Sequence, residues 1–129
     1  MGAMDALGHG GRPAVGAAKA GGSLVRAWDV RGVCEEQVIS MGAKWIKVDF
    51  KEDGAGVGGY AKESSAEFQA AQRETFFKNA KDVDIIITTA AIPGRASPVL
   101  IDEEMVKAMK PGGVIVDLAS RGGGNCVLT

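Results

Sequence analysis

The segment 84–90, which contains a run of consecutive apolar residues, constrains the fold of this chain most strongly. It reads Asp-Ile-Ile-Ile-Thr-Thr-Ala. A strand with one face in water alternates apolar and polar residues. A strand in a parallel sheet is covered by helices on both faces and is apolar at successive positions. We therefore expect a buried parallel strand here.

Strand-like and helix-like segments alternate along most of the chain. The other segments that we expect to be strands are 24–29, 44–50 and 114–119. Those expected to be helices are 13–21, 33–41, 61–81 and 102–109. This alternation predicts right-handed crossovers and an α/β fold with a parallel sheet and helices on both faces.

A glycine cluster lies about 20 residues before an acid, Asp29, that follows the segment 24–28. This is the spacing of a Rossmann-like dinucleotide-binding fold. The cluster keeps two glycines of the G-x-G-x-x-G pattern, Gly8 and Gly11, and has Ala6 at the first position. Only Met1–Asp5 precede it, so we expect the first strand to be missing and the sheet to be incomplete.

We divide the chain accordingly. Residues 1–21 form an atypical glycine-rich lead-in with a degraded dinucleotide fingerprint, and residues 22–129 form a partial Rossmann-like domain. We expect the sequence to be a fragment of a longer protein, or a gene model with a wrong start.

Asp29 is a candidate ribose ligand. A carboxylate at this place can accept hydrogen bonds from two ribose hydroxyls, and it repels a phosphate on either of them, which favours NAD over NADP. Arg31 complicates this prediction, because an arginine can accommodate that phosphate. Alternatively, Asp29 only begins a turn. The residue types leave both interpretations open.

Four segments should converge at the carboxyl edge of the sheet, where open parallel sheets bind ligands. They are 29–31, 54–60, 88–93 and 119–125. The glycine-rich loop that ends at Tyr60 could close over a ligand, or it could be an ordinary surface loop. No nucleophile and base pair is evident. Hydride transfer needs none, because the cofactor carries that chemistry.

Composition excludes several classes of protein. The chain has 129 residues, 46% hydrophobic and 24% charged, which fits one globular domain. A net charge of −1 argues against nucleic acid as a partner. No apolar run approaches the length of a membrane span. We expect the two cysteines to be unlinked thiols, and we see no metal-ligand spacing.

Several motifs, in the right order, closely resemble the proton-translocating NAD(P) transhydrogenases, in particular the NAD(H)-binding domain of their alpha subunit. The likeness runs from about Gly22 to Thr129. The segments that carry it are 48–54, 58–62, 83–90, 92–94, 109–112, 116–119 and 123–126.

The resemblance implies a cofactor, NAD(H), and hydride transfer to NADP(H) on a separate domain, coupled by a membrane domain to proton translocation. It also implies a homodimer, and a soluble domain associated with an inner mitochondrial or bacterial plasma membrane. The family's cofactor-binding positions fall on Gly8 (pyrophosphate), Asp29, Val30 and Arg31 (ribose), Gly59 and Tyr60 (mobile loop), Gln72 (cofactor side) and Ala91 (nicotinamide side).

Two alternatives remain. An alanine-dehydrogenase-type oxidoreductase would need a substrate-binding lysine and histidine from a domain that this sequence lacks, and the loop at 51–62 favours transhydrogenase. The chain could also be a nucleotide-binding module with no turnover alone. One departure from the family is Ser120-Arg121, where the family has a small residue followed by an acid.

Overall fold

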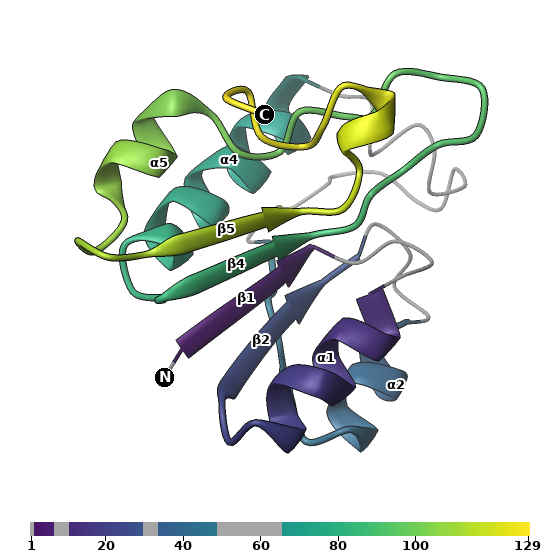
Figure 1. The fold of residues 1–129 in the computed structure, drawn as a ribbon, viewed down its shortest axis with the longest axis vertical. Helices are drawn as coiled ribbons and strands as arrows, with labels where there is room; N and C mark the ends of the chain where they lie inside the picture. The colour runs from purple at the N-terminus through teal and green to yellow at the C-terminus, as the bar shows by residue number, and fades with distance from the viewer. Residues whose placement is uncertain (1, 7–10, 30–33, 49–65) are drawn as a thin grey trace.

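The computed structural model describes residues 2–6, 11–29, 34–48 and 66–129 and shows one five-stranded sheet (Figure 1). All neighbouring strands are parallel, in the order β3-β2-β1-β4-β5. The strands are β1 (Gly2–Ala6), β2 (Leu24–Trp28), β3 (Lys44–Trp45), β4 (Ile85–Thr88) and β5 (Val114–Asp117). The predicted α/β class with a parallel sheet is confirmed.

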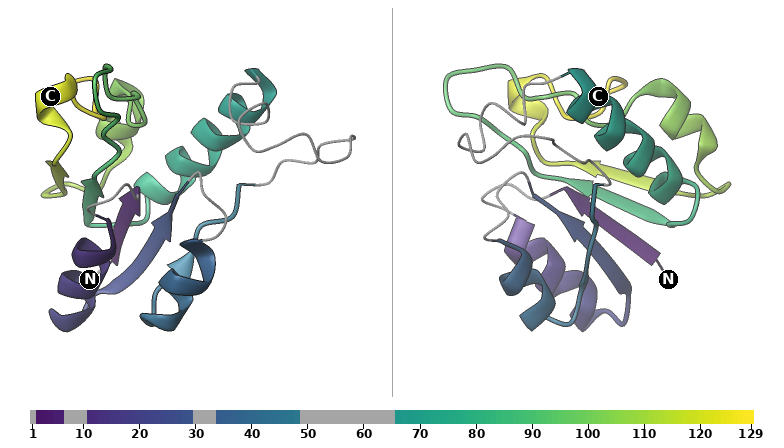
Figure 2. Two further views of the ribbon diagram at one scale, coloured as in Figure 1. Left: turned by 90° about the vertical axis from the view of Figure 1, so that its right-hand side faces the viewer. Right: turned by 180° about the vertical axis from the view of Figure 1, so that it is seen from behind.

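Helices cover both faces of the sheet, as predicted. The helices are α1 (Gly11–Ala20), α2 (Cys34–Ser40), α4 (Ala66–Ala80) and α5 (Glu103–Ala108), and a short 3-10 turn, Ser120–Gly122, follows β5. The helices α1 and α2 lie on one face, near β2, and α4 and α5 lie on the opposite face (Figure 2). Among the described residues, no helix has the length and apolar character that crossing a membrane requires.

The expectation that the first strand is missing is wrong. β1 occupies the centre of the sheet and pairs with β2 on one side and β4 on the other. Its sequence, Gly-Ala-Met-Asp-Ala, has few of the β-branched or aromatic residues that mark strands. Two neighbouring strands supply its backbone partners, so pairing determines its conformation more than local propensity does.

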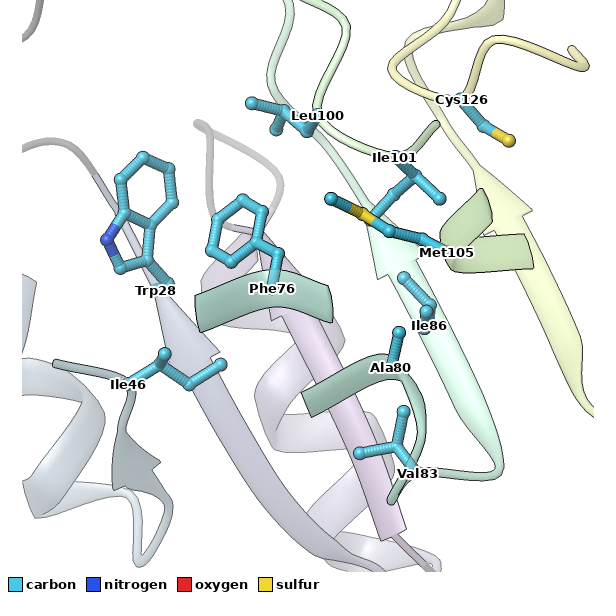
Figure 3. Packing of buried hydrophobic residues seen from close by; sticks show 10 residues of the cluster. All are labelled: Trp28, Ile46, Phe76, Ala80, Val83, Ile86, Leu100, Ile101, Met105 and Cys126. Carbon is cyan, nitrogen blue, oxygen red and sulfur yellow. The ribbon is translucent and has the colours of Figure 1, made fainter. Parts of the chain in front are cut away.

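The larger apolar cluster lies between the sheet and the helices α4 and α5 (Figure 3). Phe76 of α4 stands edge-on to Trp28 of β2, with ring centroids 5.0 Å apart and an interplanar angle of 83°. Ile86 of β4 is fully buried beneath the same helices, together with Met105 of α5. These contacts fix α4 against the carboxyl half of β2.

The smaller cluster lies on the other face, under α1 and α2. Val25 and Ala27 of β2 contact Val15 of α1 and Val38 of α2 in it, and all four are buried. Their neighbours in β2 face the opposite way, as strand alternation requires. The guanidinium of Arg26 accordingly donates to Asn79 at the end of α4.

Some predicted segments are shorter in the structure. The strand expected at 44–50 is observed as the two residues of β3, and residues 49–50 lie outside the described part. The helix expected at 61–81 is observed as α4. α1 ends at Gly21-Gly22, where Gly22 has a φ of +86° that favours glycine.

The outer part of the α1 face, over β4 and β5, is only partly covered. Val114 and Val116 are 50% and 42% exposed, and their register partners Ile85 and Ile87 are half-buried. The prediction that β4 is covered on both faces therefore holds fully for the side of α4 and α5 and only in part for the other side.

Candidate functional site

The direction of chain progression across the sheet reverses between β1 and β4. From β1 the chain moves outward to β2 and β3, and it then returns to β4 and β5 on the other side. The carboxyl edge at such a switch point is where open α/β sheets bind ligands, because the loops after the two strands diverge there. The candidate site is therefore at the end of β1.

Two predicted site segments flank that point. Ala6, the last residue of β1, pairs with Trp28 of β2 and with Thr88 of β4. Asp29 is one residue past Trp28, and Thr89 is one residue past Thr88. The structure thus brings Asp29 and the exit of β4 to the two sides of the β1 terminus.

Asp29 is buried, with 3% of its surface exposed. A carboxylate taken out of water is costly unless it is hydrogen-bonded or paired. Whether Asp29 binds a ribose or only begins a turn depends on residues 30–33, which lie outside the described part. Its role as a ribose ligand stays a prediction.

The exit of β4 combines buried and exposed residues. Thr88 and Thr89 are buried, Ala90 is half-buried, and Ala91 is exposed. The amide of Ala91 donates to the carbonyl of Thr89 at 3.0 Å, which forms a tight turn. Ala91 is therefore available at the surface of the same edge as Asp29.

Gln72 lies on α4, half-buried, one helical turn before Phe76. Residues four apart share a helix face, so Gln72 lies on the side of α4 that packs on Trp28. Because α4 leads into the amino end of β4, its first turns lie toward the carboxyl edge. The other predicted positions, Gly8, Val30, Arg31, Gly59 and Tyr60, lie outside the described residues.

Asn125 joins the loops that follow β4 and β5. Its side chain is fully buried. Its Nδ2 donates to the carbonyls of Ala90 and Pro98, both at 2.8 Å, and its Oδ1 accepts from the amide of Ala90 at 3.0 Å. Its backbone carbonyl accepts from the amides of Leu100 and Ile101. One residue thus fixes both ends of the segment 90–101.

Asp117, the last residue of β5, binds Asn125 and residues that lie before and after Asn125 in the chain. Its carboxylate accepts from the amides of Ala119, Asn125 and Cys126 at 2.8–3.0 Å and from the hydroxyl of Thr129 at 2.5 Å. Burial alone would raise the pKa of Asp117, but these hydrogen bonds outweigh it and hold the pKa below the ordinary value of 3.8.

The glycines at 122–124 let the two loops approach closely. A Cβ atom on Gly122 would lie 2.3 Å from Ser97 Oγ, and one on Gly124 would lie 2.6 Å from Asp117 Oδ2. Gly123 and Gly124 also have φ angles of +96° and +87°. A larger residue at Gly122 would separate the two loops that Asn125 joins, and one at Gly124 would displace Asp117 or Thr129.

Asn125 falls in 119–125, one of the four segments expected at the carboxyl edge, and Asp117 falls in a family motif, but neither residue was predicted to have a role of its own. Asn125 meets Ala90 and Pro98 across 35 and 27 positions, and no local pattern reports such a meeting. The run of three glycines was the available signal, since it indicates a close backbone approach. Within the described residues, no group of His, Cys, Asp or Glu could hold a metal ion, and Cys126 is a buried free thiol.

Comparisons with known proteins show which proteins this chain is similar to. The chain is 56% identical over 119 residues to NAD(P) transhydrogenase subunit alpha of Haemophilus influenzae, which covers 92% of this chain and 23% of that protein. Alanine dehydrogenase of Bacillus subtilis is 54% identical over only 43 residues, 33% of this chain and 11% of that protein.

The solved structure of a transhydrogenase from Sinorhizobium meliloti superposes with a TM-score of 0.81 at 38% identity, over 99% of this chain and 33% of that chain. The chain thus spans a third or less of the length of these relatives. Residues 6–129 match the family described as alanine dehydrogenase/PNT, C-terminal domain. Since this match covers nearly all of the sequence, the chain belongs to the alanine dehydrogenase/PNT C-terminal domain family.

Proposed function

We propose that this chain is the NAD(H)-binding part of a transhydrogenase, which passes hydride between NAD(H) and NADP(H). The observation that carries the proposal is the place of Asp29. It is a buried carboxylate at the end of β2, next to the switch point between β1 and β4. A dinucleotide-binding sheet has its ribose acid at this place.

The proposal gives each predicted site residue a part in holding the cofactor. Asp29 would accept hydrogen bonds from the adenosine ribose, and Ala91 would lie at the nicotinamide side. Gln72 would face the cofactor. By the family resemblance alone, since they lie outside the described residues, Gly8 would approach the pyrophosphate, Val30 and Arg31 would line the ribose, and Gly59 and Tyr60 would cover the cofactor. When bound, the nicotinamide supplies the hydride donor or acceptor. The protein's part is to hold and orient it.

The rest of the proposal concerns the longer protein. We expect an NADP(H)-binding domain as hydride partner and a membrane domain that couples transfer to proton translocation. The NAD(H)-binding part would then be a soluble domain associated with a membrane, and we expect it to form a homodimer. The names of the Haemophilus influenzae and Sinorhizobium meliloti relatives support this proposal.

Titration of the 129-residue chain with NADH and NADPH, followed by calorimetry, tests the proposed site. We expect NADH to bind and NADPH to bind more weakly, because Asp29 repels the 2′-phosphate. The substitution Asp29→Asn keeps the volume and removes the charge. A lost hydrogen bond to a charged group is worth about 1.5–3 kcal/mol, so NADH affinity should fall roughly tenfold to a hundredfold.

The control is Glu74→Gln, which removes a charge from an exposed ion pair with Lys78 on α4. It should leave NADH affinity unchanged. If the unsubstituted chain bound neither nucleotide, the proposed site would be wrong. If it preferred NADPH, the role assigned to Asp29 would be wrong.

A second assay separates the proposal from a module that only binds. The chain is mixed with a separately purified NADP(H)-binding domain of a transhydrogenase, and hydride exchange is followed with a nicotinamide analogue. Exchange that needs both components supports transhydrogenase function. Binding without exchange would favour a nucleotide-binding module.

A further inference from the structure

We propose that Asn125 is a positioning residue for the nicotinamide side of the candidate site. It acts through the backbone of Ala90, which precedes the predicted cofactor contact Ala91. The inference rests on the NAD(H) site proposed above. It adds that the side-chain amide of Asn125 sets the geometry of one half of that site.

The first argument is that Asn125 grips Ala90 at two points. Its Oδ1 accepts from the Ala90 amide and its Nδ2 donates to the Ala90 carbonyl, at 3.0 and 2.8 Å. Two bonds to one residue fix the orientation of both peptide planes beside it. The peptide that joins Ala90 to Ala91 is one of these planes, so Asn125 orients the start of Ala91.

The second argument is that Asn125 is itself rigidly held. Asn125 is fully buried, and its backbone amide donates to Asp117 Oδ2 at 2.8 Å. Asp117 terminates β5, which pairs directly with β4. The hydrogen bonds from Asn125 to Ala90 therefore connect Ala90 to β5. They hold the residues after β4 in a fixed position relative to the sheet.

The third argument is chemical. The two carbonyls that face Nδ2, those of Ala90 and Pro98, need donors, and the Ala90 amide needs an acceptor. A primary amide supplies two N–H donors and one carbonyl acceptor. A carboxylate of the same shape has no donor, so Asn125→Asp would set an oxygen against two carbonyl oxygens. The residue type is thus matched to its task.

ADP-ribose separates a positioning role from a merely structural one, because it is NADH without the nicotinamide. We expect Asn125→Asp to weaken NADH binding about tenfold, the scale of one lost buried hydrogen bond or more. The affinity of the variant for ADP-ribose should stay within about twofold of the affinity of the unsubstituted chain. The probe is calorimetric titration of the 129-residue chain with each nucleotide at one pH.

The matched control is Ser97→Ala in the same pair of loops. It removes the bond from Ser97 Oγ to the carbonyl of Ala119, at 3.2 Å, and leaves Ala90 untouched. It should change the affinity for both nucleotides little and equally. Equal loss of both nucleotides in Asn125→Asp would overturn the positioning role, and so would unchanged NADH binding in that variant.

A measurement on the unsubstituted chain decides the matter if Asn125→Asp does not fold. Hydrogen exchange of the Ala90 amide, followed by NMR, should slow when NADH binds and stay the same when ADP-ribose binds. The same exchange rate with both nucleotides would overturn the inference. If the unsubstituted chain bound neither nucleotide, the proposed NAD(H) site would itself fail, which is a different result.

Discussion

At the scale of single residues, Asp117 contributes most to holding the turn after β5 in place. One carboxylate receives three backbone amides and one hydroxyl. Hydrogen bonds to an ionised acceptor are about twice as strong as those between neutral groups. The turn after β5 is therefore held by hydrogen bonds to a single charge.

This charge gives a prediction for Asp117→Asn. The folded-state pKa of Asp117 lies below its ordinary value of 3.8. Its stabilisation is therefore fully present above that ordinary value and is lost as the pH falls through the folded pKa. At pH 7 the variant should lose about 2 kcal/mol of unfolding free energy. The difference from the unsubstituted chain should shrink below about pH 4. Urea melts at pH 7 and pH 3 measure both quantities.

The control for this prediction is Asp82→Asn. The Arg26 guanidinium, bonded to the carboxyl of Asp82, also holds its pKa low. This pair is exposed, so the substitution should cost much less at pH 7. Equal losses in the two variants would mean that the turn after β5 does not depend on Asp117.

At the scale of elements, the loops after β4 and β5 act as one unit. The amide of Ser97 donates to the carbonyl of Gly122 at 2.8 Å, and the amide of Leu100 donates to Asn125 O at 2.8 Å. The glycine run makes this approach possible. The exit of β4, which borders the candidate site, should therefore keep a constant spacing from the exit of β5.

Two glycines test how tightly the turn after β5 packs around Asp117. Gly112 and Gly124 have similar φ angles, +83° and +87°. A Cβ on Gly112 would meet nothing within 4 Å, whereas one on Gly124 would press on Asp117 and Thr129. Both alanine variants pay about 1–2 kcal/mol for the left-handed backbone. Gly124→Ala should lose clearly more in thermal melts. Equal losses would show that Asp117 and Thr129 can move away from residue 124 without cost.

Local patterns in the sequence predict most of these elements and not the contacts between them. β4 is recognisable because it has three successive isoleucines, and β2 because four of its five residues are apolar. β1 is not, since small residues become a strand there only through pairing with two neighbours. Asp29 could be singled out by its spacing from the glycine cluster. Asn125 could not, because its partners lie 27 and 35 positions away.

At the scale of the whole molecule, helices cover the two faces of the sheet to different extents. Ile115 of β5 packs against the cluster beneath α4 and α5, while Val114 and Val116 on the other face are largely exposed. A contiguous apolar surface of this kind binds hydrophobic probes. The chain should therefore bind a fluorescent hydrophobic dye in its folded state.

The double substitution Val114→Lys and Val116→Lys should reduce that dye binding strongly. The unfolding free energy should change by only about 0.5 kcal/mol, because surface positions tolerate charge. Ile115→Lys, one residue away on the covered face, should destabilise the chain by about 2 kcal/mol or more. Similar stabilities for the two variants would contradict the assignment of the faces.

The central place of β1 has a consequence for the order of folding. The amide of Gly2 bonds to the carboxylate of Asp84, which lies 82 positions later. During synthesis, the innermost strand therefore emerges long before the strand that completes its pairing. Until β4 is made, only β2 can pair with it, and closing so long a loop is slow. The assembly of this sheet is thus timed by the arrival of β4, and the same event first forms the edge on which a nucleotide could bind.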